Sequence, residues 1–233
     1  MRRRLTYVAG LSLVAATTAL AGCGGSSSGN GVASKSPTEI LSAAKAAADG
    51  ASSVHVSGST VTAGTPLTLD LSLVANRGGR GRIAENGLSF ELIELEGTIY
   101  IKGSTAFYKH FAGAAAAQLL QGKWLKAPAT SASFAGLSSL VELHKLLDAA
   151  LASSDKALVK TGASTLKGQA VVGVKDTAQG ETIYVATTGR PYPVAATKSG
   201  AGGGTIAFAE WNKPVTLTAP ANAVDIEQLQ HSQ

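Results

Sequence analysis

The stretch PLTLDLSLVA, residues 66–75, decides the fold of this chain. Four leucines alternate in it with a threonine, an aspartate and a serine. This strict period of two residues predicts a β-strand with one apolar face and one solvated face. The apolar face of a sheet must be covered by another layer, so the rest of the chain has to supply that cover.

Segments with strand character lie on both sides of this stretch. Turns that contain glycine separate most of them, which favours an antiparallel meander. We interpret NRGGRGR (76–82) as a hairpin turn, and we expect a β-bulge in 88–97, where apolar residues fall on both faces after Leu92. The expected strands are VHVSGSTV (54–61), RIAEN (82–86), LSFELIELEG (88–97), TIYIKG (98–103), GKWLKAP (122–128), QAVVGVKD (169–176), ETIYVATT (181–188), YPVAATKS (192–199) and GTIAFAEW (204–211).

Three segments have helical character. SPTE (36–39) is a capping box, with Ser36 as N-cap, and it opens a helix expected over 37–49. Residues 105–120 are rich in alanine, and residues 137–151 carry an amphipathic pattern. About 200 residues with two strand blocks around a helical segment suit one α+β domain, which we place at 36–233.

The N-terminus has the features of a bacterial lipoprotein signal. Three arginines precede an apolar run over 7–20, which is shorter than the roughly 20 residues of a membrane span. Leu20-Ala21-Gly22-Cys23 matches the lipobox, so we expect a signal peptide over 1–22 and a lipid anchor such as palmitate on Cys23. Export by the Sec or the Tat route stays open. Residues 23–35 are rich in glycine and serine, and we interpret them as a flexible tether.

Charge and chemistry argue against several functions. The leader carries three arginines and no acidic residue, so the net charge falls from +5 to +2 once it is removed. We therefore expect no nucleic-acid partner. Neither the four histidines (His55, His110, His144, His231) nor the single cysteine have metal-ligand spacing, so we expect no metal and no cofactor. Glu91 and Glu94 have opposite strand parity and should not form an acid–base pair.

The remaining signal is apolar. A curved antiparallel sheet covered by helices either forms a packed core or keeps an apolar cavity that binds apolar ligands, and composition leaves both open. Trp124 and Trp211 fit core or rim positions. Strand parity and amphipathicity assign the candidate lining to Leu67, Leu69, Leu71, Leu73, Phe90, Leu92, Ile99, Ile101, Phe107, Phe111, Leu140, Leu143 and Leu147.

Several fragments, in this order, resemble the actinobacterial LppX/LprG-type (LppX_LprAFG) lipoproteins. They are the lipobox at 20–23, PTEILSAAKAA (37–47), EGTIYIKG (96–103), GKWLKAP (122–128), ETIYVATTGRPYPVAAT (181–197) and FAEWNKPVTLTAPANAVDI (208–226). The resemblance implies a fold like that of the lipoprotein carrier LolA. This fold is a strongly curved antiparallel sheet, or half-open β-barrel, with helices covering its concave face. It also implies binding of acylated lipids or glycolipids and their transport in the cell envelope.

We therefore expect a monomeric, non-enzymatic lipoprotein anchored on the outer face of the cytoplasmic membrane. It would bind an acylated lipid or glycolipid and exchange it with an envelope transporter. One alternative is a structural or signalling envelope lipoprotein that acts through a protein partner without lipid cargo. Another is a lipid hydrolase, which would need a serine, a histidine and an acid brought together by the fold.

Overall fold

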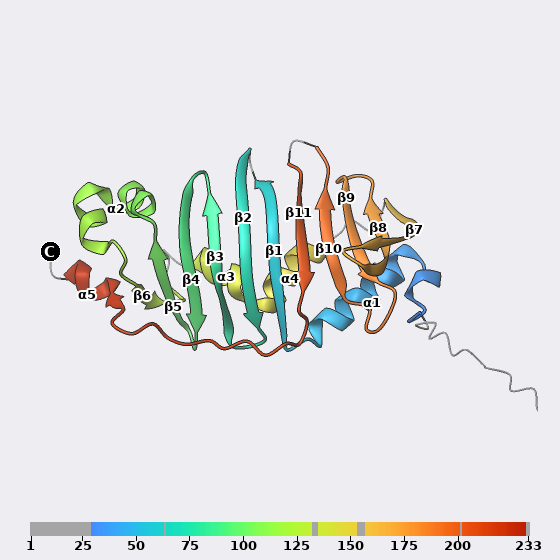
Figure 1. Cartoon of the computed structure of the whole chain (residues 1–233), viewed down its shortest axis with the longest axis horizontal. Coiled ribbons are helices and arrows are strands. Elements are labelled where there is room, and N and C mark those ends of the chain that lie inside the picture. Colours follow the sequence, from blue (N-terminus) through green and yellow to red (C-terminus); the bar gives the residue numbers. More distant parts are fainter. Residues whose placement is uncertain (1–28, 63, 132–134, 153–156, 201, 232–233) are drawn as a thin grey trace, which may run out of the picture.

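The computed structural model describes residues 29–62, 64–131, 135–152, 157–200 and 202–231. The predicted signal peptide, the lipobox and Cys23 lie outside these residues. The described chain forms one sheet of twelve strands in the order β12-β6-β5-β4-β3-β2-β1-β11-β10-β9-β8-β7. All neighbours are antiparallel except β12 and β6, which are parallel. The sheet is curved and does not close (Figure 1).

The elements follow the predicted order, with an additional strand at 158–166 and additional short elements at 224–231. The helices are η1 (Val32–Ser34), α1 (Pro37–Asp49), α2 (Thr105–Leu120), α3 (Ala135–Val141), α4 (Leu143–Leu151) and α5 (Ile226–His231). The strands are β1 (Ser53–Thr62), β2 (Thr65–Val74), β3 (Gly78–Glu85), β4 (Leu88–Leu95), β5 (Thr98–Gly103), β6 (Leu125–Pro128), β7 (Leu158–Leu166), β8 (Gln169–Asp176), β9 (Glu181–Ala186), β10 (Pro193–Lys198), β11 (Gly204–Ala209) and β12 (Val224–Asp225).

Helices α1, α3 and α4 cover one face of the sheet, which we call the inner face. They lie behind the strands in Figure 1, with α1 against β7–β10 and α3 against β2–β4. The opposite side, turned toward the viewer, is the outer face. The predicted α+β architecture, a curved antiparallel sheet with helices over its concave face, is therefore confirmed.

The leucine row of β2 behaves as its period predicts. Leu69, Leu71 and Leu73 are buried on the inner face, whereas Asp70 is exposed on the outer face. Strand β1 pairs with β2 along its whole length and connects the first strand block to β11 of the last block. One continuous core results, because side chains from both blocks and from α1, α3 and α4 belong to a single apolar cluster.

Helix α1 begins as predicted. Ser36 is the N-cap, its hydroxyl accepts the Glu39 N–H, and the Glu39 carboxylate accepts the Ser36 N–H at 2.9 Å. The Ser36 hydroxyl also donates to the Glu39 carboxylate at 2.6 Å, and this bond, with that from the Ser36 N–H, lowers the pKa of the Glu39 carboxyl. The helix ends at Gly50, and its inner stripe of Ile40, Ala44 and Ala48 is buried.

The predicted tether is shorter than expected. Val32 is only 1% exposed and belongs to the main core. The Asn30 amide donates to the carbonyls of Ala186 and Gly189, at 2.9 and 3.1 Å. Residues 29–35 are therefore part of the folded body. Composition missed this because one buried valine and one hydrogen-bonded asparagine are enough to dock a glycine-rich segment.

Two predictions in the first strand block are wrong. The turn between β2 and β3 is confined to 75–77, and the arginines of NRGGRGR at 80 and 82 lie inside strand β3. Strand β4 pairs with β3 and β5 without a register shift, so it has no bulge. Ile93 therefore stays on the outer face, where a hollow beside Trp124 accommodates it.

The helix predicted over 137–151 is broken at Glu142, which has an extended backbone (φ −92°, ψ 114°) and is the N-cap of α4. Val141 and Leu143 are both almost completely buried. Two residues at this spacing point in nearly opposite directions on a continuous helix. The break lets both side chains face the sheet, and this burial outweighs one turn of helical hydrogen bonds.

Candidate functional site

The structure brings together most of the predicted cavity residues. Twelve of the thirteen belong to the main apolar cluster of the inner face or pack against it. The exception is Phe111, which is 67% exposed on α2 and lies outside that cluster. Those inside or against the cluster are Leu67, Leu69, Leu71, Leu73, Phe90, Leu92, Ile99, Ile101, Phe107, Leu140, Leu143 and Leu147.

Helical side chains fill the centre of the inner face. Leu71, Leu73 and Leu92 have no exposed surface, and they share one apolar cluster with Val141 of α3 and Leu147 of α4. A void of about 10 Å³ lies farther along the sheet, beside α1 and β7–β9. Such a volume holds about one water molecule. The centre of this face is thus a packed core in the structure as it stands.

Packing loosens toward the end of the sheet where α2 lies. Leu67 and Phe90 are half-buried there, and the Phe90 ring packs against the Phe107 ring at a tilt, with centroids 5.1 Å apart. Phe107 in turn lies 4.7 Å from the ring of Phe111, which is exposed. These three rings form an apolar path from the inner face of the sheet to the surface of the molecule.

Two features hold α2 in this position. Ser104 caps the helix by accepting the Phe107 N–H at 3.2 Å. Tyr108 is 2% exposed, and its hydroxyl accepts the Gly103 N–H at 2.9 Å and donates to the Lys123 carbonyl at 3.1 Å. Burial raises the pKa of the Tyr108 hydroxyl. The helix changes direction at Gly113 (φ 84°), a conformation that favours glycine.

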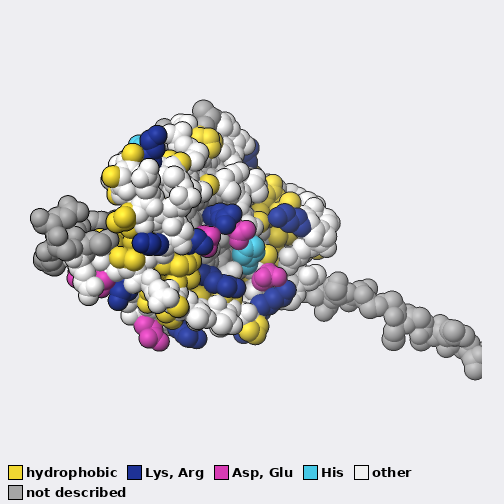
Figure 2. Space-filling view, turned by 60° about the vertical axis from the view of Figure 1, so that its left-hand side comes forward, with side chains coloured by type: hydrophobic (Ala, Val, Ile, Leu, Met, Phe, Trp, Pro, Cys, Tyr) yellow, Lys and Arg dark blue, Asp and Glu magenta, His cyan; other side chains and the backbone are white. Residues whose placement is uncertain are grey.

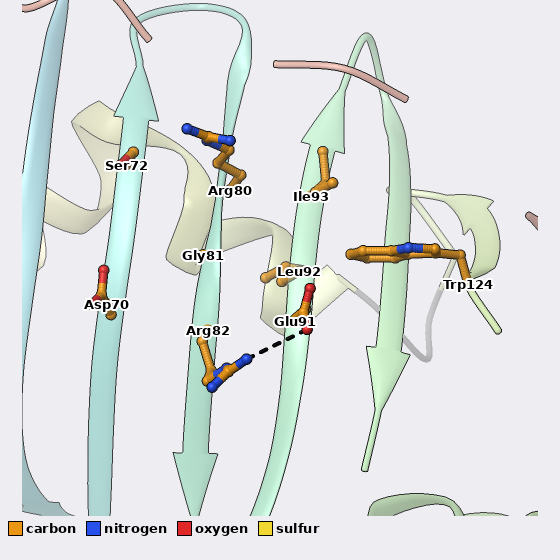
Figure 3. A pocket seen from close by; sticks show the side chains of 9 residues that line it. All are labelled: Asp70, Ser72, Arg80, Gly81, Arg82, Glu91, Leu92, Ile93 and Trp124. Carbon is orange, nitrogen blue, oxygen red and sulfur yellow. Dashed lines mark hydrogen bonds and ion pairs between the residues drawn. The ribbon is translucent and has the colours of Figure 1, made fainter. Parts of the chain in front are cut away.

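The outer face carries a second candidate site. A hollow of about 450 Å³ opens over β2, β3 and β4, and the segment before β6 borders it on one side. Figure 3 shows the Trp124 ring lying across β5 toward β4, with Arg80 and Arg82 on the other side. Its lining consists of Asp70, Ser72, Arg80, Gly81, Arg82, Glu91, Leu92, Ile93 and Trp124.

Most of the charged side chains around this hollow have a hydrogen-bond or ion-pair partner among the described residues, but one does not. The Glu91 carboxylate lies 3.4 Å from Arg82 and 3.6 Å from Lys102. The Asp70 carboxylate lies 2.9 Å from the Nε2 atom of His55. Around the site, basic and acidic side chains are interspersed (Figure 2). Within the described part of the chain, the Arg80 guanidinium has neither a hydrogen bond nor an ion pair, although it lines the hollow.

The other candidate groups do not converge. Glu91 faces outward, whereas Glu94 accepts a hydrogen bond from the Ser138 hydroxyl at 2.8 Å, so the predicted separation of these carboxylates is confirmed. Trp211 is half-buried at the edge of the core, stacks on Tyr192 and donates to the Pro193 carbonyl. In the ranges that the structure describes, no three His, Cys, Asp or Glu side chains form a metal-binding group.

Sequence reasoning missed the outer hollow. It assigned Arg80 and Arg82 to a turn and treated Trp124 as a core or rim residue. The period of β2 places Asp70 and Ser72 on the outer face, but only strand pairing shows that Arg80 lies beside Ser72 and that Ile93 lies beside Arg80 there. Among the described helices, none is long and apolar enough to cross a membrane.

These features define a class of fold, an open and strongly curved antiparallel sheet whose concave face is covered by helices. Among solved structures, the chain is similar to LprF from Mycobacterium bovis, with a TM-score of 0.53 and 17% identity. The alignment covers 80% of this chain and 97% of LprF. At this identity the likeness shows a common fold, and it confirms the fold implied by the resemblance to the LppX/LprG-type lipoproteins.

A second structure, the Mycobacterium tuberculosis lipoprotein LppX, aligns over 78% of this chain and 100% of its own, with a TM-score of 0.49 and 18% identity. No protein-family model matches the sequence, and no curated protein matches it significantly. The fold assignment therefore depends on the architecture and on LprF.

Proposed function

We propose that this chain is an envelope lipoprotein that binds an acylated lipid or glycolipid against the inner face of its sheet. Cys23 would carry the membrane anchor, and the fold common to this chain and LprF supports the proposal. The observation that carries it is the apolar path formed by Phe90, Phe107 and Phe111. A closed core has no need for aromatic rings that extend to an exposed phenylalanine.

The mechanism would be partition. Each methylene group that leaves water for an apolar environment gains about 0.8 kcal/mol. Because helical side chains fill the centre of the inner face, an acyl chain would enter at the end where α2 lies and displace side chains of α3 and α4. The break at Glu142 makes these two short helices separate packing units, which favours such a displacement.

The test is the cargo of the full chain purified in mild detergent from an actinobacterial host. Native mass spectra under gentle activation should show a discrete non-covalent adduct, and extraction should identify it as a diacyl or triacyl lipid. Uptake of added dipalmitoyl phosphatidylglycerol should fall in Phe111→Ser. It should be unchanged in Val159→Ser, because Val159 is an exposed apolar residue of β7 outside the aromatic path. An adduct-free mass with no uptake would overturn the proposal.

A second function is favoured by one observation. Phe111 and Leu119 are both about two-thirds exposed on α2, as expected for a site that docks a protein partner. A protein-binding envelope lipoprotein would carry no lipid in the experiment above. Its partner should then be cross-linked through photoreactive groups placed at 111 and 119 but not at 159.

A further inference from the structure

The outer hollow is separate from the proposed lipid site. The sheet itself lies between them, because residues on successive positions of a strand point to opposite faces. Ser72, Arg80 and Ile93 occupy paired positions across β2, β3 and β4 and face outward. Leu71 and Leu92, one position away on their strands, belong to the inner core. A ligand in the hollow would therefore leave the acyl path free.

The walls of the hollow differ in chemistry. On one side lie two apolar groups, the Trp124 ring and the Ile93 side chain, and the Lys102 ammonium lies 5.5 Å from the centroid of the Trp124 ring. On the opposite side, Arg80 presents a guanidinium with no partner among the described residues (Figure 3). A guanidinium binds carboxylates and phosphates through two parallel hydrogen bonds.

The polar side chains between these walls can form hydrogen bonds with the hydroxyl groups of a ligand. Asp70 and Glu91 supply carboxylate oxygens, and Ser72 supplies a hydroxyl. Glu91 pairs with Arg82 and Lys102, and Asp70 lies 2.9 Å from the His55 ring, so neither carboxylate pairs with Arg80. The site is thus complementary to a polyhydroxylated molecule that has one flat apolar face and one acidic group.

The size of the hollow also argues against a simple anion. Its volume of about 450 Å³ falls within the range of roughly 300–1,000 Å³ that is typical of small-molecule sites. An inorganic anion would use Arg80 and leave the indole face of Trp124 without contact. A sugar ring places its C–H face on the indole and its hydroxyls toward the carboxylates.

We propose that the outer hollow binds an acidic sugar, with its acid group on Arg80 and its ring on Trp124. This inference does not depend on lipid binding at the inner face. The sugar belongs either to a free saccharide or to the headgroup of a glycolipid, because both present the same ring and acid. Loss of Trp124 should abolish binding of the ring, and loss of Arg80 should remove the preference for the acid.

The chain has only two tryptophans, which allows a direct test. In ¹⁵N–¹H spectra of the full chain in mild detergent, each indole N–H gives one cross-peak. Glucuronate, glucose and acetate would be titrated as ring with acid, ring alone and acid alone. We expect glucuronate to shift the Trp124 peak in a saturable manner and to leave the Trp211 peak in place, because Trp211 donates its N–H to Pro193 elsewhere on the sheet.

Matched variants separate the two contacts. Arg80→Gln should weaken glucuronate binding roughly tenfold, to the level of glucose, because it removes a charge-assisted hydrogen bond. Arg77→Gln changes an exposed arginine in the turn before β3 and should bind normally. Trp124→Leu should lose binding of all rings, as measured by calorimetry. Unchanged inner-face lipid uptake in both pocket variants would show that the two sites are independent.

The outcomes are distinct. If glucuronate binds equally with and without micelles of glucuronosyl diacylglycerol, the ligand is a free saccharide. If these micelles displace glucuronate at a concentration below that of glucuronate, the ligand is a glycolipid headgroup. Both results support the proposal. The proposal is overturned if no probe moves the Trp124 peak, if acetate binds as tightly as glucuronate, or if Arg80→Gln and Arg77→Gln behave alike. A failure here leaves the cargo experiment unaffected, because that experiment reads a different face.

Discussion

The ring of Phe107 lies directly against Gly103, the last residue of β5. A Cβ atom added at position 103 would come within 2.4 Å of the Phe107 Cδ1 atom and 3.2 Å of its Cβ atom. Phe107 is the middle ring of the aromatic path, between Phe90 and Phe111. A glycine at the end of β5 therefore decides how closely α2 approaches the sheet.

We expect Gly103→Ala to push Phe107 away from the sheet. The overlap involves the Phe107 Cβ atom, so a rotation of the ring alone does not relieve it. Overpacking of this kind costs about 1–3 kcal/mol of unfolding free energy, which urea denaturation would measure. Lipid uptake should fall in parallel. Gly136→Ala is the control, because position 136 has open space around it and the substitution should change stability and uptake little. Gly97→Ala is unsuitable because Gly97 has a positive φ.

Tyr108→Phe should destabilise the chain although it removes a single oxygen. The Tyr108 hydroxyl satisfies both the Gly103 N–H and the Lys123 carbonyl. Losing these two part-buried hydrogen bonds costs about 0.5–1.5 kcal/mol each, and amide exchange should accelerate at Gly103. Tyr100→Phe, on the outer face of the neighbouring β5 segment, should have an effect close to zero. Equal effects of the two substitutions would show that Tyr108 does not hold α2.

Val32→Ala should reduce stability even though it lies in a segment of linker-like composition. Val32 is completely enclosed by the core, and removing two methyl groups leaves a cavity. We expect a loss of about 1–3 kcal/mol in chemical denaturation. Ala33→Gly and Ser34→Ala flank it and should cost less. A Val32→Ala variant as stable as the parent would restore the predicted tether up to residue 35.

The stability of the chain should decrease as the pH rises through the titration of Glu181. Burial is the main cause of the raised pKa of this carboxyl; nearby Asp176 adds to it and Lys198 opposes it. The folded state therefore binds the proton more tightly than the unfolded state. This stabilisation is complete below the unfolded-state pKa and is lost as the pH passes the folded-state pKa.

Glu181→Gln should remove this pH dependence. Compared with the parent, its midpoint of urea denaturation should fall less between pH 4 and pH 7, with a gain in relative stability at pH 7. Glu210→Gln replaces an exposed carboxylate and serves as the matched control. A parallel pH profile for parent and Glu181→Gln would contradict the assignment.

Local sequence was sufficient for elements whose signals are local. The capping box of Ser36 and Glu39 and the period of β2 rest on interactions within a few residues, and both are confirmed. The same holds for α2, whose cap is Ser104. Strand β7 (Leu158–Leu166) was missed because its residues alternate weakly, and its partner β8 supplies the pairing that defines it.

Tertiary structure decided the features that depend on partners far along the chain. The break at Glu142 arises because the sheet offers burial to both Val141 and Leu143. Likewise, Ile93 needs no bulge because Trp124, thirty-one positions later, shares its hollow. The amino-acid pattern alone determined the alternation, the caps and hence an antiparallel sheet that helices must cover, whereas the strong curvature was implied by the resemblance. Only the folded chain decided how full the inner face is and what the outer face gathers, since packing sums contacts that no local pattern contains.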